Sequence, residues 1–180
     1  ALLRATAPMA NAAREVDAVV AAYRPQSDAP VRITATTSVS MFLSRQLPTL
    51  RAASAPREVL ILPSRRVFDL EAGEADIALR MRSLPKTRGM LARKLGTVVF
   101  AVYGVSSDTR LPILMPSNNA SVSRQYAVAR RAAAMRPIGP EIDEMHLRYQ
   151  AVKSGVGVGC LPCFLGDAEP RVFVTDPPAF

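Results

Sequence analysis

The segment QAVKSGVGVGCLP, residues 150–162, has the pattern of a helix that ends on glycine and passes directly into a buried strand. Lys153 suits the last helical turn, because a cation there interacts favourably with the negative end of the helix dipole. Gly155 suits the position after the helix, where a left-handed backbone is common. The alternating valines and Leu161 that follow are typical of a buried strand. The segment therefore predicts one helix-to-strand step of a sheet layered with helices.

Strand and helix patterns also alternate upstream. Residues 31–35 alternate like a strand, and the hydroxyls of residues 36–38 suit the N-terminus of the apolar helical face that follows. Residues 58–62 and 76–79 predict two more strands, with a short helix capped by Ser64 between them. The order β-α-β-α-β predicts a parallel sheet with right-handed crossovers.

The rest of the chain continues the mixed pattern. Residues 97–103 form the longest apolar, β-branched run and are expected to cross between two lobes. Residues 112–116 and 171–174 predict short strands, and residues 122–135 predict a helix. Asp143 is expected to cap the helix that contains His146 and Tyr149 and ends at Gly155. The chain is therefore predicted to have an α/β fold.

The N-terminal residues carry an apolar heptad. One heptad position holds Leu2, Met9, Val16 and Tyr23, and the second holds Ala5, Ala12 and Val19. This 3.5-residue period predicts a helix that packs along another helix, and the alternative is an amphipathic helix docked on its own domain. Pro8 requires the helix to begin or kink there. Residues 24–30 have a linker composition.

The composition bounds the class of protein. The chain has 180 residues, and 49% of them are hydrophobic, so it is expected to fold around a sizeable core. No apolar run approaches the ~20 residues of a membrane helix, and residues 1–8 are too weakly apolar for a signal peptide. We therefore expect a cytoplasmic protein with no membrane partner. The net charge is +8, but the arginines are scattered, which favours a solvated surface over a nucleic-acid face.

The two cysteines, Cys160 and Cys163, have the Cys-x-x-Cys spacing of redox pairs and of half a zinc site. A zinc site requires two more ligands, and His146 is the only histidine. A redox motif opens a helix, whereas Cys160 is expected to end a strand. Structural thiols are therefore favoured, and neither a metal nor a cofactor is expected.

Catalytic patterns are weak. Ser38, His146 and Asp143 can be combined into a triad on paper, but no nucleophile-elbow motif surrounds the serine. The glycines of residues 155–159 follow a helix, whereas those of a dinucleotide loop precede one. We therefore expect a binding protein and not an enzyme.

Hydroxyl groups at helix N-termini are the better candidates for a site. Thr36, Thr37 and Ser38 follow the first strand, where ligands of open α/β sheets bind, and free N–H groups there suit an anion. Ser117, Asn118 and Ser121 offer a similar set elsewhere in the chain. The alternative is that these hydroxyls only cap helices.

Four segments carry a family resemblance. They are VRITATTSVS leading to LPTL (residues 31–50), DLEAGEADIALR (69–80), ARKLGTVVFAVY (92–103) and the segment that ends at Pro162. In this order and spacing they resemble the effector-binding domain of LysR-type transcriptional regulators over nearly the whole chain.

The resemblance implies a two-lobed, type II periplasmic-binding-protein-like fold with a small effector between the lobes. It implies lobe I at residues 30–98 and 166–180, lobe II at 99–165, and at 1–24 the end of a linker helix that makes a homodimer or homotetramer. Thr37 and Ser38 match hydroxyl positions of the effector cleft, and Asp143 lies where a second cleft helix begins. The expected effector-binding residues are Thr36, Thr37, Ser38, Ser117, Asn118, Ser121 and Asp143.

The expected function is therefore to sense a small anionic metabolite and so control DNA binding and transcription. Arg80 and Arg82 hint at an anion, although either arginine could instead hold acidic neighbours. The family's winged helix-turn-helix is absent from these residues, so DNA contact is assigned to the parent protein. Family members also usually continue into one more strand and helix.

Three rival functions stay open. A solute-binding transport component of the same fold predicts an export signal and no dimerising helix. A Cys-x-x-Cys oxidoreductase predicts a reactive thiol pair. A dimerisation and partner-contact module predicts that no effector binds.

Overall fold

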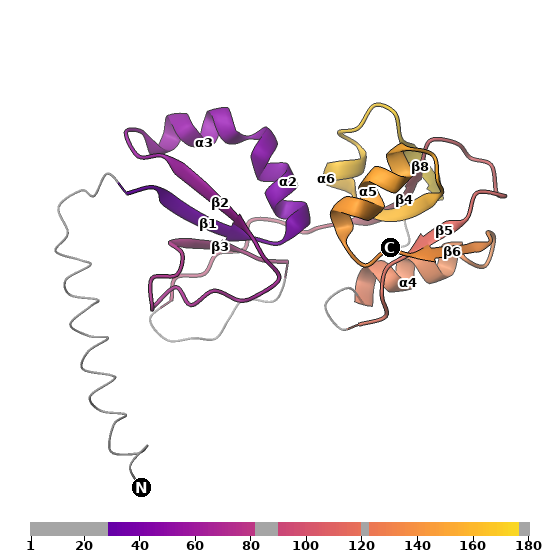
Figure 1. Cartoon of the computed structure of the whole chain (residues 1–180), viewed down its shortest axis with the longest axis horizontal. Coiled ribbons are helices and arrows are strands. Elements are labelled where there is room, and N and C mark those ends of the chain that lie inside the picture. Colours follow the sequence, from indigo (N-terminus) through magenta and orange to yellow (C-terminus); the bar gives the residue numbers. More distant parts are fainter. Residues whose placement is uncertain (1–28, 82–89, 120–122, 177–180) are drawn as a thin grey trace, which may run out of the picture. The chain divides into compact units, whose positions relative to one another are not determined.

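The computed structural model describes residues 29–81, 90–119 and 123–176. The predicted linker helix at residues 1–24, Ser121 and Arg82 lie outside these described residues. The chain divides into two compact units (Figure 1). Of the described residues, the first unit holds 29–36 and 43–80, and the second holds 37–42, 81, 90–119 and 123–176.

The first unit contains a three-stranded sheet in the order β2-β1-β3. Its strands are β1 (Val31–Ala35), β2 (Val59–Pro63) and β3 (Ile77–Leu79), and both pairings are parallel, as predicted. Ile33 lies beside Ile61 on one side and Ile77 on the other. The connection from β1 to β2 contains α2 (Thr37–Arg45) and α3 (Leu47–Ser54), where one helix was expected.

The helix predicted to begin at Ser64 is wrong, because residues 64–76 form bends and turns. Three side chains accept the backbone N–H groups that a helix would use. The Ser64 hydroxyl accepts from Arg66 N at 3.0 Å, and the Asp69 carboxylate accepts from Ala72 N at 3.0 Å. The Glu74 carboxylate accepts from Asp69 N at 2.7 Å. Such local bonds compete with helix formation, and here they replace it.

The second unit contains a five-stranded sheet in the order β6-β5-β7-β4-β8. Its strands are β4 (Phe100–Gly104), β5 (Ile113–Met115), β6 (Ile138–Glu141), β7 (Val158–Pro162) and β8 (Phe173–Asp176). Its helices are α4 (Ser123–Ala132), α5 (Met145–Lys153) and α6 (Cys163–Gly166). Strands β5, β6 and β7 are parallel, and β4 is antiparallel to β7 and β8. The sequence did not predict β6 or α6.

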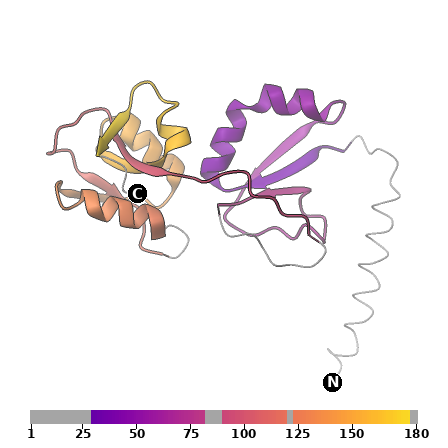
Figure 2. The ribbon, with the colours of Figure 1, turned by 180° about the vertical axis from the view of Figure 1, so that it is seen from behind.

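Each face of this sheet has its own core. On one face, α4 covers a cluster that includes Val102, Ile113 and Cys160, which we call the α4-side core. On the other face, α5 and α6 cover the α5-side core, which includes Tyr103 and Leu161. The helices lie on opposite sides of the sheet in Figure 1 and, seen from behind, in Figure 2. Every residue of β7 is buried, because this strand supplies both cores.

The junction of α5 and β7 confirms the helix-to-strand step predicted from the sequence. Ser154 is the C-cap of α5, and Gly155 follows with a positive φ of 73°. Gly155 N donates to Val152 O at 3.0 Å, and Val156 N donates to Ala151 O at 3.1 Å. These two bonds form a Schellman motif, which satisfies carbonyls that the end of the helix leaves open.

The lobe boundaries expected from the sequence stay a prediction. The resemblance assigned residues 166–180 to the first lobe. In the structure, β8 lies beside β4 in the second unit, with Val174 opposite Tyr103 and Phe173 opposite Gly104.

Candidate ligand-binding site

The N-terminus of α2 lacks the usual side-chain cap. The N-cap residue Thr36 has an extended backbone (φ −66°, ψ 156°), its side chain makes no capping bond, and the first turn contains no acidic residue. The first N–H groups of a helix have no partner within the helix, and the dipole makes that end positive. The Thr36 hydroxyl is buried and makes no hydrogen bond in the part of the chain that the structure describes.

Thr36, Thr37 and Ser38 lie together at the β1–α2 junction, because they are consecutive in the chain. Thr37 and Ser38 begin the helix, and Ser38 is buried, with 3% of its surface exposed. Buried polar groups are normally hydrogen-bonded, so an unpartnered Thr36 hydroxyl beside open helix N–H groups is the arrangement expected of an anion site.

Arg80 has a different role from the one suggested by the sequence. Its Nη2 donates to Thr34 Oγ1 at 2.8 Å and to the carbonyl oxygen of Arg66 at 3.0 Å. Thr34 Oγ1 in turn donates to Leu62 O on the neighbouring strand at 3.2 Å. Arg80 therefore ties β1 to the loop that follows β2, and its position does not argue for an anionic ligand.

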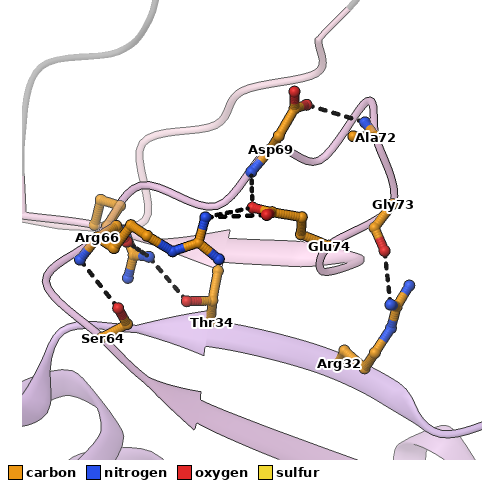
Figure 3. Close-up of polar contacts among 9 residues, drawn as sticks. Arg32, Thr34, Ser64, Arg66, Asp69, Ala72, Gly73 and Glu74 are labelled. Carbon is orange, nitrogen blue, oxygen red and sulfur yellow. Dashed lines mark hydrogen bonds and ion pairs between the residues drawn. The ribbon is translucent and has the colours of Figure 1, made fainter. Parts of the chain in front are cut away.

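The same loop is held by an ion pair. Arg66 Nη1 lies 3.0 Å from each carboxylate oxygen of Glu74, and the Arg66 guanidinium stacks over the Phe68 ring at 4.3 Å. Figure 3 shows the Glu74 carboxylate bonded both to the Arg66 side chain and to the backbone of Asp69. The bond from Asp69 N, followed by that from Arg66, lowers the pKa of Glu74. Sequence reasoning missed this network because its partners belong to separate segments of the chain.

A second group of predicted residues lies at the carboxyl ends of β5 and β6. Ser117 and Asn118 follow β5, and Asp143 follows β6; the strands are parallel, so all three lie at the same sheet edge. The Ser117 hydroxyl and Glu141 Oε1 are hydrogen-bonded at 2.6 Å, and Asn118 is exposed.

The prediction that Asp143 caps α5 is wrong. Glu144 is the N-cap, with an extended backbone (φ −73°, ψ 121°), and its carboxylate accepts from His146 N at 3.5 Å. The helix therefore begins one residue later than a cap at Asp143 requires. Asp143 instead has a buried carboxylate oxygen and offers its carbonyl to Arg148.

Arg148 is fully buried on the inner side of α5. Its guanidinium donates to the carbonyls of Ile142 and Cys160 and to the side-chain oxygen of Gln125. These partners belong to the β6–α5 connection, to β7 and to α4. Arg148 therefore joins three parts of the second unit, and no sequence pattern indicated this.

The cysteines lie on opposite faces of the second sheet. Cys160 belongs to the α4-side core, whereas Cys163 packs against the α5-side core, and both thiols are free. Burial raises the pKa of Cys160 to about 12, so its reactive thiolate is scarce. This placement disfavours the redox interpretation. No group of three metal-ligating side chains occurs within residues 29–81, 90–119 and 123–176.

No family model and no curated protein matches the sequence. Solved structures do match the fold. The regulatory domain of CrgA, a LysR-type transcriptional regulator from Neisseria meningitidis, aligns with a TM-score of 0.62 and 19% identity. The alignment covers 84% of this chain and 82% of that domain. This chain has the fold of LysR-type regulatory domains.

Two further structures share this LysR regulatory fold. The regulatory domain of CcmR from Synechocystis, solved in complex with 2-PG, aligns with a TM-score of 0.54 and 16% identity over 82% of this chain and 80% of that one. The CrgA chain of a second structure aligns with a TM-score of 0.63 and 22% identity over 96% of this chain. The present chain covers 63% of that longer CrgA chain, slightly less than two thirds. These matches confirm the predicted fold class.

In the segments that the structure describes, no helix is both long and apolar enough to span a bilayer.

Proposed function

We propose that this chain is the effector-sensing domain of a LysR-type transcription regulator and that a small anionic metabolite binds at the N-terminus of α2. The observation that carries the proposal is the buried Thr36 hydroxyl, which has no hydrogen-bond partner in the described chain, at a helix end without a side-chain cap. The LysR regulatory fold supports the sensing role, and it favours a binding domain over an enzyme.

The chemistry of the site favours an anion. Helix N–H groups and hydroxyls donate hydrogen bonds, and the positive end of the helix dipole stabilises negative charge. The first turn of α2 has no acidic residue that would compete for these donors. A carboxylate or phosphate accepts several such bonds at once, and charged acceptors make the stronger ones.

Thr36, Thr37 and Ser38 form the primary set of contacts in this proposal. Ser117, Asn118, Ser121 and Asp143 remain a proposed second set. We further propose that the chain acts in the cytoplasm, that it associates through its N-terminal heptad segment, and that the parent protein contacts DNA through a domain outside this chain. To control transcription, the metabolite must bind one state of the regulator more tightly than another.

The test is a thermal-shift screen of small carboxylates, phosphates, amines and neutral sugars, followed by calorimetric titration of each hit. A ligand present at about 100 times its Kd should stabilise the chain by about 2.7 kcal/mol. Anions should dominate the hits. A screen in which amines or sugars bind and anions do not would contradict the anionic proposal.

Variants then locate the site. Thr36→Val and Thr37→Val remove one hydroxyl each while keeping the side-chain shape, so each should weaken anion binding about 10- to 100-fold, as for the loss of a charge-assisted hydrogen bond. Thr49→Val, at an exposed position on α3, is the matched control and should bind normally. Equal affinities in all three variants would place the binding site elsewhere.

A further inference from the structure

Helix α4 presents a uniformly basic outer face. The residues of α4 that are exposed are Arg124, Ala127, Arg130 and Arg131. The helix contains no acidic residue. Its inner side packs on the α4-side core through Ala129 and Ala132. This grouping is not evident from the sequence alone, because it is the turn of the helix that places these arginines on one face.

The guanidinium groups of Arg124, Arg130 and Arg131 make no hydrogen bond or ion pair within the described ranges. Two nearby arginines do have partners. Arg110 pairs with the Asp108 carboxylate at 2.8 Å, and Arg136 donates to the Asp108 carbonyl at 2.6 Å. The guanidinium groups of Arg110 and Arg136 thus have partners, whereas those of α4 are open to solvent.

We propose that this α4 face, made by Arg124, Arg130 and Arg131, binds the phosphate backbone of double-stranded DNA without reading its sequence. The seven steps from Arg124 to Arg131 rise about 10 Å along the helix axis. DNA carries about one negative charge per 1.7 Å of its axis, so a face of this length lies opposite several phosphates. Guanidinium groups also match the geometry of phosphate oxygens.

The composition of the face favours DNA over an acidic protein. The exposed residue of α4 between the arginines is small, Ala127. Protein interfaces depend on buried aromatic or large apolar anchors, and this face has none among its exposed helix residues. Small residues do allow a phosphate backbone to approach closely. The proposal is independent of the effector site, because it uses a different helix.

The test measures binding to a short fluorescein-labelled duplex of arbitrary sequence by anisotropy at several salt concentrations. Three phosphate contacts predict a slope of about −2.7 for log K against log salt, which is about a 40-fold loss of affinity between 50 and 200 mM salt. The triple variant R124Q/R130Q/R131Q should lose most of this slope. Glutamine has a helix propensity close to that of arginine, and circular dichroism checks that α4 is retained.

The matched control is R45Q/R51Q/R57Q, which removes three charges from the first unit. It should bind the duplex like the original chain. Equal weakening of both triple variants would show general charge attraction and overturn the proposal, as would no binding at low salt. Tighter binding of polyglutamate than of the duplex would also overturn it. The α4 variant should keep the thermal shift produced by any effector, so failure here is distinct from failure of the proposed function.

Discussion

Gly157, just before β7, is a glycine at which an added methyl group would meet a backbone oxygen. A Cβ at this position would lie 2.5 Å from Pro112 O and 3.1 Å from Leu114 Cδ2. The Pro112 carbonyl is also fixed, because it accepts from Val158 N at 2.9 Å. We therefore predict that Gly157→Ala destabilises the second unit by forcing β7 away from β5.

The expected change in the free energy of unfolding combines three effects. Overpacking a tight site costs about 1–3 kcal/mol. Weakening the hydrogen bond from Val158 N to Pro112 O costs about 1 kcal/mol. Replacing glycine by alanine lowers the entropy of the unfolded chain, which offsets about 0.4–1 kcal/mol. The expected net fall in the free energy of unfolding is therefore about 1–3.5 kcal/mol.

Urea denaturation followed by far-UV circular dichroism measures this change. Gly96→Ala is the matched control: Gly96 is exposed, has no atom within 4 Å of its Cβ position and has no positive φ, so this variant should equal or slightly exceed the original stability. Gly155→Ala should cost about 1–2 kcal/mol, because its φ of +73° strains any residue with a Cβ. If Gly157→Ala were as stable as Gly96→Ala, steric contact with β5 could not be the reason for this glycine.

Two further predictions concern the second unit. The Glu169 carboxylate lies 2.8 Å from Lys153 Nζ and accepts from Tyr149 Oη at 3.0 Å, and these contacts, Lys153 first, lower the pKa of Glu169. The stabilisation from this lowered pKa is complete above the ordinary glutamate pKa of 4.5 and is lost as the pH falls through the lower pKa of the folded state. Glu169→Gln should therefore reduce stability at neutral pH. When the urea midpoint is plotted against pH, the variant should also show a smaller fall at acid pH than the original chain. Parallel curves for the two proteins would contradict this. A thiol titration should modify Cys163 in the native state and Cys160 only after unfolding, and mild oxidation should form no disulfide between them. Loss of both native thiols, with a mass fall of two hydrogens, would count against the placement of the cysteines on opposite faces.

Sequence reasoning succeeded where the determinants were local. The end of α5 was predictable because Gly155 and Lys153 act within a single turn, and β7 was predictable because both of its faces are apolar. Thr36, Thr37 and Ser38 share the β1–α2 junction because they are consecutive, and their role as ligand contacts stays a prediction. The fold class followed from the order of these local steps and from the family resemblance.

Sequence reasoning failed where distant partners decide the outcome. The loop at residues 64–76 has an apolar pattern compatible with a helix, but Glu74 accepts the backbone N–H of Asp69 and pairs with Arg66. The role of Arg80 was left open between an anionic ligand and acidic neighbours, because Thr34, 46 positions away, could not be recognised as its partner. The N-cap of α5 was predicted at Asp143 and is Glu144 in the structure. Sequence propensities do not define a helix boundary to within one residue.

Arg148 has a consequence for how the second unit selects one packing arrangement. An aliphatic side chain at this buried position could be accommodated at several rotations of α5, since apolar contacts have little directionality. The guanidinium has a planar fork of donors, and its acceptors at Gln125, Ile142 and Cys160 are fixed by three different parts of the unit. Only one rotation and one axial position of α5 satisfy all of them. Arg148 therefore disfavours arrangements in which α5 is rotated or shifted along its axis. An apolar replacement is expected to give similar stability but a less uniquely defined position of α5.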